Sequence, residues 1–211
     1  MLQVKQLTCV RADRPVFQGL SFDLKASRLM QVVGVNGSGK TSLLRILAGL
    51  LKPAEGSVIW RGMPIEQQTS DYSLARVYMG HANALKGDLS AMENLHWACL
   101  LAGRDPTQPV IAEALNHWGL NRRHHLPLRV LSQGQQRRAA LARLSLLLDA
   151  KLWLLDEPFA ALDTEAQEAL EHLIARFLDE GGSVILTTHQ AFGLSPRITD
   201  RVDLDRLRAS C

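Results

Sequence analysis

The sequence predicts an α/β fold, in which a sheet covered by helices carries an inserted helical lobe. Short apolar runs alternate with helical patterns at both ends of the 211-residue chain, the arrangement of a sheet covered by helices. A glycine-rich loop at residues 34–41 joins one of these runs to a helix. Residues 85–131 have helical patterns only, which indicates the lobe. We expect residues 1–211 to form a single domain.

Composition restricts the class of protein. The formal net charge is only +3, and the basic side chains are scattered, so nucleic acid is not an expected partner. Cys9, Cys99 and Cys211 lie far apart in no metal-ligand spacing, which suits a reducing compartment. The chain has no signal-peptide pattern and no apolar run of about 18 residues. We therefore expect a cytoplasmic protein that reaches membranes only through a partner.

In the first quarter of the chain, apolar and polar residues alternate, as in strands with one exposed face. Residues 2–8 and 16–24 are predicted strands, with a turn at Arg14–Pro15. Residues 57–60 are a third candidate. These segments form the expected amino-terminal antiparallel β subdomain.

The core elements follow in order. Residues 29–33 are nearly all apolar and end in glycine, as in a buried parallel strand. Residues 41–50 have helical spacing, which Gly49 and Lys52–Pro53 end. Residues 77–79 are another short strand candidate. After the loop at residues 103–106, which separates predicted helices at 94–101 and 110–118, the α/β pattern resumes, with helices at 135–148 and 164–178 and strands at 152–155 and 183–187.

The glycine-rich loop has the P-loop pattern, which ends in Lys40 and Thr41. Its glycines let the backbone approach a polyphosphate, so that successive N–H groups and the following helix terminus face the phosphate oxygens. Lys40 suits the β- and γ-phosphates, and the Thr41 hydroxyl can ligate Mg²⁺. The candidate binding residues here are Gly34, Val35, Asn36, Gly37, Ser38, Gly39, Lys40, Thr41 and Ser42.

Two further segments narrow the class of nucleotide-binding protein. Residues 131–135 read LSQGQ and begin a helix, and an apolar run at residues 151–155 ends in Asp156–Glu157. Together with the P-loop they resemble the signature and Walker B motifs of ATP-binding cassette (ABC) ATPases. The resemblance implies a P-loop NTPase (RecA-like) core, with the antiparallel subdomain and the helical lobe added to it.

The resemblance also implies roles for individual residues. Asp156 would hold Mg²⁺, and Glu157 would act as general base on the attacking water. His189, in ILTTHQ at residues 185–190, would contact the γ-phosphate, and Asp163 would act across a dimer. Ser132, Gly134 and Gln135 would bind the ATP held by a second copy, in a sandwich homodimer.

Two positions depart from the family pattern. Arg11 stands where ABC ATPases usually place an aromatic residue against adenine, and its guanidinium plane can stack on a base; a plain exposed arginine is the alternative. His81 stands at the Q-loop position, where the family has glutamine. It could reach Mg²⁺ or the attacking water through a ring nitrogen, so it is a candidate catalytic or metal-binding residue.

A closer resemblance covers almost the whole chain. Gly80–His81, LSAMENL at residues 89–95, LSQGQQRRAALARL and LWLLDEPFAALD are similar to the haem-exporter ATPases of bacterial cytochrome c maturation. This implies the ATPase subunit of a membrane ABC transporter, which powers haem export or the release of a haem-loaded chaperone. It also implies a permease subunit and haem-handling maturation proteins as partners, at the cytoplasmic face of the bacterial inner membrane.

Other classes remain as alternatives. A cassette for lipoprotein release or small-nutrient import would be expected to have glutamine at position 81. ABC ATPases of DNA repair insert long coiled coils, and those of translation carry two cassettes, whereas this chain has one cassette and a short lobe. A P-loop kinase would leave residues 131–135, Asp163 and His189 without a role.

Overall fold

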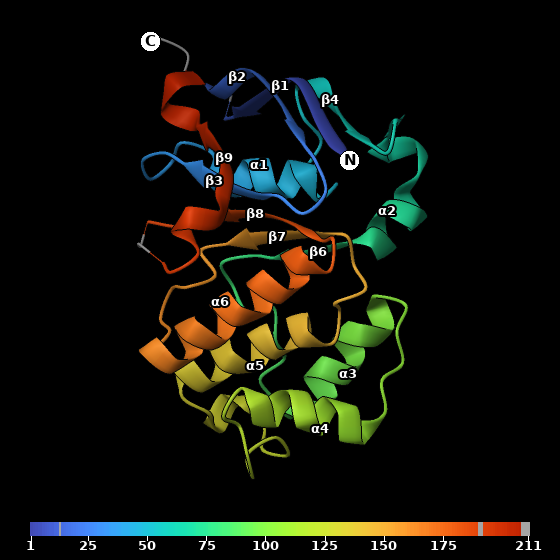
Figure 1. The fold of residues 1–211 in the computed structure, drawn as a ribbon, viewed down its shortest axis with the longest axis vertical. Helices are drawn as coiled ribbons and strands as arrows, with labels where there is room; N and C mark the ends of the chain where they lie inside the picture. The colour runs from blue at the N-terminus through green and yellow to red at the C-terminus, as the bar shows by residue number, and fades with distance from the viewer. Residues whose placement is uncertain (13, 190–191, 208–211) are drawn as a thin grey trace.

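A computed structural model describes residues 1–12, 14–189 and 192–207. Two sheets and the helices around them form stacked layers (Figure 1), with the antiparallel sheet at one end and helix α4 at the other. The strands are Leu2–Arg11 (β1), Arg14–Leu24 (β2), Leu29–Val33 (β3), Glu55–Trp60 (β4), Met63–Pro64 (β5), Arg76–Met79 (β6), Leu152–Asp156 (β7), Ser183–Thr187 (β8) and Ile198–Asp203 (β9). The α-helices are Lys40–Leu47 (α1), Thr69–Ala75 (α2), Ala91–Leu101 (α3), Gln108–His117 (α4), Gln133–Ser145 (α5) and Thr164–Asp179 (α6). Short 3-10 helices span Ile65–Gln67, Leu128–Val130, Ser195–Arg197 and Leu204–Leu207.

The predicted antiparallel subdomain is confirmed as a sheet with strand order β2-β1-β4-β5. The predicted turn at Arg14–Pro15 was wrong, because Pro15 pairs with Val10 and Arg14 with Arg11. Strand β2 lies at the sheet edge, where a proline leaves no ladder hydrogen bond unmade. The two strands are therefore longer than the pattern indicated.

The core sheet is parallel throughout, with strand order β6-β7-β8-β3-β9. Its central strands β7 and β8 are buried on both faces, as their continuous apolar runs predicted. Trp153, Leu155 and Leu186 pack toward the helical lobe, whereas Leu154 and Ile185 pack toward α1 and the antiparallel sheet. The alternation of side chains along each strand thus joins both layers to one sheet.

The helical lobe packs on the core through the same cluster of buried side chains. Leu95 of α3 and Leu115 of α4 belong to a cluster that also contains Leu141 of α5 and Trp153 of β7. Helix α3 begins with a capping box, in which Ser90 accepts from the Glu93 N–H and the Glu93 carboxylate accepts from the Ser90 N–H. The lobe predicted at residues 85–131 therefore shares the core of the parallel sheet.

The carboxyl ends of β3, β7 and β8 lie at the same edge of the parallel sheet. The glycine-rich loop follows β3, Glu157 follows β7, and His189 lies two residues after β8. In open α/β sheets this edge is where ligands bind. The topology therefore places three separated motifs around one site.

Among the described residues, no helix combines the length and the apolar character needed to cross a membrane. Cys9 and Cys99 are free and buried, and Cys211 lies outside the described residues. The described part of the chain also contains no group of three or more His, Cys, Asp or Glu side chains that could hold a metal ion by themselves.

Candidate functional site: a phosphate-binding cleft

The glycine-rich loop depends on backbone conformations that glycine adopts readily. Gly39, directly before α1, has φ of +99°, and a Cβ added there would lie 2.6 Å from Val16 Cγ1. At Gly34 an added Cβ would lie 2.4 Å from Ser38 Oγ. Larger residues at these positions would force the loop away from β2 or open its turn.

The cationic side chain of the loop is Lys40, the first residue of α1. Its Nζ donates to the carbonyl oxygens of Gly34 and Val35 at 2.8 and 3.2 Å. The loop is fastened from outside by Asp205, whose Oδ2 accepts from the Val35 N–H at 2.9 Å. The ammonium group therefore lies under the loop, in reach of any anion that the loop amides bind.

Asp156 is held by two hydroxyl groups from different elements. Its Oδ2 accepts from Thr41 Oγ1 at 2.7 Å, and its Oδ1 accepts from Thr187 Oγ1 at 2.8 Å. The Asp156 side chain is buried. A carboxylate and a hydroxyl this close form the oxygen donor set that Mg²⁺ prefers. Thr41 and Asp156 therefore fit the predicted metal-binding role.

Glu157 has a left-handed backbone, with φ of +49°. Its N–H donates to Thr187 Oγ1 at 2.8 Å, and its carbonyl accepts from Arg137 Nη2 at 2.8 Å. A left-handed conformation is unfavourable for a residue with a side chain and persists only where neighbours enforce it. These two bonds, and a third from the Ala160 N–H to the Glu157 carbonyl at 3.2 Å, hold it here.

The Glu157 carboxylate faces His189. Glu157 Oε1 lies 3.4 Å from His189 Nε2, yet within the described structure this buried oxygen accepts no hydrogen bond. The two observations agree, because the contact is longer than an ordinary hydrogen bond and becomes an ion pair only when the imidazole is protonated. A carboxylate oxygen with an unused lone pair, beside a phosphate-binding loop, is suited to polarising a water molecule.

These side chains surround a cleft of about 530 Å³, a size in the range of small-molecule sites. Its lining includes residues of the glycine-rich loop, the Asp156–Glu157 pair and His189. Arg11 and His81, the two residues that depart from the family pattern, also line it. Val16 and Ala160 also line it, although the sequence pattern did not single them out. The complete lining is Arg11, Val16, Asn36, Gly37, Gly39, Lys40, Thr41, Ser42, His81, Asp156, Glu157, Ala160 and His189.

Three other predicted loop residues, Gly34, Val35 and Ser38, belong to the loop but not to the lining of the cleft. They shape the turn: the Ser38 N–H donates to Val35 O at 3.1 Å, and Ser38 is buried. Gln190 of the last motif lies outside the described residues.

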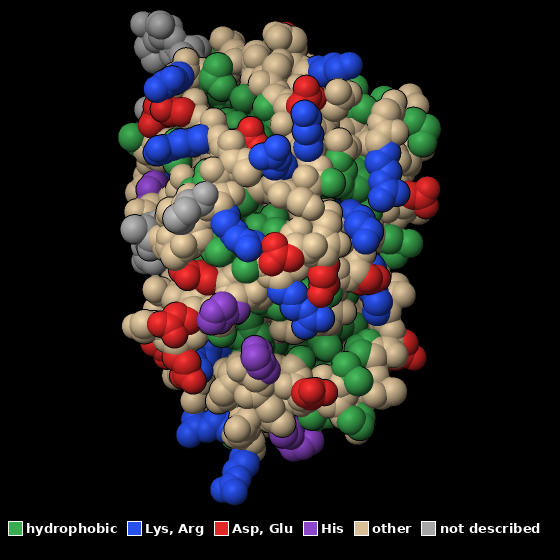
Figure 2. Space-filling view, in the orientation of Figure 1, with side chains coloured by type: hydrophobic (Ala, Val, Ile, Leu, Met, Phe, Trp, Pro, Cys, Tyr) green, Lys and Arg blue, Asp and Glu red, His purple; other side chains and the backbone are tan. Residues whose placement is uncertain are grey.

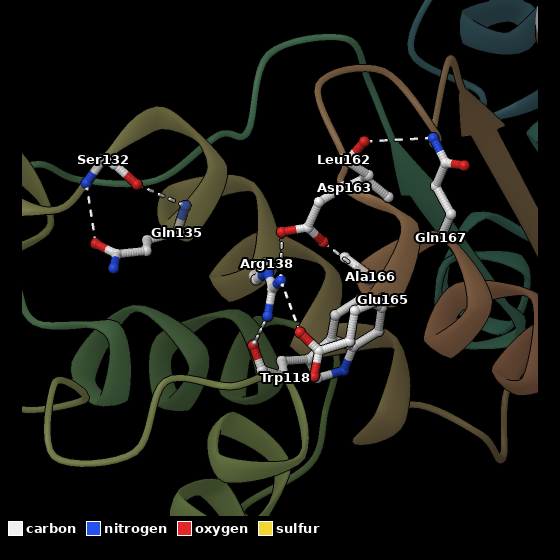
Figure 3. A network of polar contacts seen from close by, with 9 residues as sticks. All are labelled: Trp118, Ser132, Gln135, Arg138, Leu162, Asp163, Glu165, Ala166 and Gln167. Atoms are coloured by element: carbon white, nitrogen blue, oxygen red, sulfur yellow. Dashed lines mark hydrogen bonds and ion pairs between the residues drawn. The ribbon is translucent and has the colours of Figure 1, made fainter.

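Ser132, Gly134 and Gln135 do not line the cleft either. Ser132 caps α5, where its hydroxyl accepts from the Gln135 N–H at 3.3 Å while Gln135 Oε1 accepts from the Ser132 N–H at 3.1 Å (Figure 3). A Cβ added at Gly134 would meet nothing within 4 Å. The start of α5 is therefore an ordered surface with open space before it.

An ion-pair network joins α5 to the loop that precedes α6 (Figure 3). Arg138 Nη2 lies 2.5 Å from Asp163 Oδ2 and 3.2 Å from Glu165 Oε2. Asp163 also caps α6 by accepting from the Ala166 N–H at 3.0 Å. The hydrogen bond from Arg138 and then that from Ala166 hold the pKa of Asp163 below its usual range. Asp163 is therefore fixed in position relative to the start of α5.

Sequence patterns did not identify three other residues near Glu157. Thr187 orients both Asp156 and Glu157, while Arg137 binds the Glu157 carbonyl and the side chain of Asn83. The sequence feature that could have pointed to Arg137 was the basic pair at residues 137–138, inside a helix that otherwise packs on the core. Which of these arginines faces inward depends on tertiary packing.

The site and fold define an ATP-binding-cassette type of P-loop protein, and the comparisons agree. Residues 17–160 match the family described as ABC transporter, and the chain belongs to that family. One solved structure, an ATP-binding subunit of an ABC transporter, superimposes with a TM-score of 0.88 over 100% of this chain and 88% of that chain, at 23% identity; this likeness concerns the fold.

Curated relatives place the chain more narrowly. It is 48% identical to the cytochrome c biogenesis ATP-binding export protein CcmA of Nitrosospira multiformis, over 94% of this chain and 96% of the relative. It is 42% identical to CcmA of Escherichia coli K12, over 100% of this chain and 99% of the relative. The resemblance stated from the sequence motifs, to ABC ATPases and to this subfamily, is confirmed.

Proposed function

We propose that this chain is the ATP-hydrolysing subunit of a membrane ABC transporter for cytochrome c biogenesis, which powers haem export or the release of a haem-loaded chaperone. The single observation that carries the ATPase assignment is the meeting of Lys40, Thr41, Asp156 and Glu157 in one cleft. The names of the relatives, cytochrome c biogenesis ATP-binding export proteins, support the transport role. We propose the whole chain as one cassette domain.

In the proposed mechanism the loop amides and Lys40 bind the β- and γ-phosphates of ATP. Thr41 and Asp156 would hold Mg²⁺, which would neutralise charge on those phosphates. The unpaired Glu157 Oε1 orients and polarises the attacking water. His189, 3.4 Å from that oxygen, contacts the γ-phosphate and keeps the carboxylate directed at the water.

The adenine base is assigned to the end of the cleft where Arg11 and Val16 contribute to the lining. A guanidinium plane can stack on a base, and a valine side chain can cover the ring through van der Waals contact. This pair takes the place of the aromatic residue that the family pattern has at the position of Arg11. His81, also in the lining, stands where the family pattern has glutamine and would serve in its place.

A second copy of the chain completes the site in this proposal. Ser132 and the backbone at Gly134 and Gln135 form an ordered helix start away from the cleft of their own chain. A helix N-terminus with open space before it suits the γ-phosphate of a nucleotide held by another subunit. The homodimer would contain two such composite sites.

The permease subunit is assigned to a groove of about 700 Å³ between the core and the helical lobe. Exposed apolar side chains are unusual on a monomer surface when they cluster, and this groove has Trp97, Leu101 and Leu50, exposed by 56%, 87% and 59%. Lys86 adds a cation to its lining. This location overlaps the segment from His81 to Glu93 that joins core and lobe.

The face shown in Figure 2 has green apolar side chains among basic and acidic ones, and no large area of a single charge sign. This mixed surface suits a protein partner. With the permease in place, the chain would lie at the cytoplasmic face of the bacterial inner membrane.

Fractionation of cells tests the transport assignment. The wild-type protein should sediment with membranes when its permease is present and remain soluble when the permease gene is deleted. Lys86→Glu should reduce the membrane-bound fraction, because it reverses a charge in the groove. Cytochrome c maturation should fail in cells that carry only Lys40→Ala. Membrane attachment without the permease, or normal maturation with Lys40→Ala, would contradict the proposal.

A further inference from the structure

Arg137 and Arg138 are adjacent on α5 but have different surroundings. Arg138 faces the acidic side chains of Asp163 and Glu165. Arg137 is buried, with only 4% of its surface exposed. Its Nη1 donates to Asn83 Oδ1 at 3.0 Å, and its Nη2 donates to the Glu157 carbonyl at 2.8 Å. One guanidinium group therefore joins two loops that are far apart in sequence.

The environment of Arg137 is unfavourable for a side chain with only a packing role. The acceptors Asn83 Oδ1 and Glu157 O are both neutral, and the buried Nε of Arg137 has no hydrogen-bond partner in the described structure. Burial lowers the pKa of the guanidinium, and attraction to Asp156 opposes that shift. Burying a cation without a direct carboxylate partner costs free energy that an apolar side chain would avoid.

Each of the two joined loops belongs to the proposed reaction site. Asn83 lies two residues after His81, in the segment between β6 and the helical lobe. Glu157 carries the proposed general base on a left-handed backbone. Thr187 accepts from the N–H of Glu157, and the Glu157 carbonyl accepts from Arg137 and, at 3.2 Å, from the Ala160 N–H. Side chains from two other elements therefore hold both backbone polar groups of this residue.

We propose that Arg137 is a positioning residue for hydrolysis, which ties the loop at Asn83 to the backbone of Glu157. Displacement of the helical lobe would move Asn83, and the guanidinium would transmit that movement to the carboxylate that orients water. This inference rests on the proposed role of Glu157 and adds a residue that acts through it. Arg137 itself does not line the cleft.

Steady-state ATP hydrolysis by purified full-length variants tests the inference. Arg137→Gln should lower kcat by about 10-fold or more, because small displacements of a catalytic group are costly, while KM for ATP stays within about 3-fold. The kcat of Arg137→Lys should lie between those of the wild type and Arg137→Gln, since an ammonium group cannot span both acceptors. Asn83→Ala should lower kcat, and adding it to Arg137→Gln should cause little further loss, because the two side chains act as a unit.

Arg143→Gln is the matched control. Arg143 lies on the same helix, its Nη2 donates to the Tyr78 carbonyl at 2.9 Å, and burial lowers the pKa of its guanidinium. The Arg143→Gln substitution should lower the thermal unfolding temperature as Arg137→Gln does, but keep kcat within about 2-fold of the wild type. If Arg137→Gln does not fold, the kcat and unfolding temperature of Arg137→Lys and Asn83→Ala are compared with those of Arg143→Gln instead.

The inference would be overturned by wild-type kcat in Arg137→Gln and Asn83→Ala, or by kcat losses in the double variant that add fully. A loss of kcat in Arg143→Gln equal to that in Arg137→Gln would reduce Arg137 to a stabilising residue and would also reject it. Failure of the proposed function would look different. The wild-type protein would then show no ATP hydrolysis that Glu157→Gln removes, which would reject both proposals.

Discussion

The hydroxyl of Thr187 donates a 2.8 Å hydrogen bond to Oδ1 of Asp156, across the neighbouring parallel strands β8 and β7. The same hydroxyl accepts from the Glu157 N–H at 2.8 Å. One side chain therefore orients two consecutive acidic residues, and its burial excludes water as a replacement partner. The carboxylate proposed to hold Mg²⁺ and the proposed base are positioned relative to each other by a residue from the next strand.

Thr187→Val tests this arrangement with almost no change in shape. Valine removes the hydroxyl, so the buried Glu157 N–H and Asp156 Oδ1 lose their partner. We expect kcat for ATP to fall by about 10-fold or more, measured at saturating Mg²⁺ and ATP. Thr187→Ser, which keeps the hydroxyl, should retain most of the activity. Equal activity in the valine and serine variants would show that the bridge does not matter.

Most elements of the core could be predicted because their residues are buried on a regular repeat. The strand at Ser183–Thr187 matches the prediction at both ends, since all of its residues are buried and Gly182 precedes it. Helix α2 was missed because only Tyr72 is buried in its seven residues. Strand β9 was missed because five of its six residues, all but Val202, are partly or fully exposed, so it has no apolar run.

Helix ends were less predictable than helix positions. Helix α5 ends at Ser145 although apolar residues continue to Leu148. Those residues pack on the lobe after the helix has stopped. Apolar spacing predicts which residues are buried, but the same burial can occur outside a helix.

Sequence motifs predicted the candidate residues that bind phosphate and act on water. They did not predict the residues that hold these side chains in place. Loop residues, Asp156, Glu157 and His189 occupy fixed positions relative to strand ends, so topology alone brings them together. The contact between Arg137 and Asn83 spans 54 residues. No local pattern encodes such a contact, because it depends on how α5 packs against the loop after β6.

Glu157→Gln separates nucleotide binding from hydrolysis. The amide keeps the size of the side chain but cannot accept a proton from the attacking water. We expect ATP affinity to remain near the wild-type value and kcat to fall by more than about 10²-fold. Equilibrium binding of ATP and phosphate release provide the two readouts. Turnover close to the wild type would assign the base to another residue, with His189 the first to test.

His81→Gln tests whether the histidine is an equivalent of the glutamine that the family pattern has there. An amide can donate and accept hydrogen bonds from a similar place in the cleft, so we expect ATP binding and at least about a third of kcat to remain. His81→Ala, which removes both abilities, should lose clearly more. The same kinetic constants measured for all three proteins would mean that His81 has no part in the reaction.

Acid should remove one contribution to folding stability. The hydrogen bond from Arg138 lowers the folded-state pKa of Asp163, so this group stabilises the fold above its unfolded pKa, which is about 3.9. That contribution is lost as the pH falls through the lower, folded-state pKa. Asp163→Asn should therefore unfold at a lower temperature than the wild type at pH 7, and the difference should shrink below about pH 4. A difference that stays constant with pH would exclude this ion pair as its cause.

Mixing two inactive proteins tests the central claim, that each working site combines the cleft of one chain with the start of α5 from another. Lys40→Ala disables the cleft and leaves Ser132 intact, while Ser132→Arg blocks the helix start and leaves Lys40 intact. Each variant alone should be inactive, but an equimolar mixture should recover ATP hydrolysis, since a heterodimer has one complete composite site. Specific activity of the wild type should also rise with protein concentration. An inactive mixture, together with a wild-type specific activity that does not change with concentration, would contradict the account.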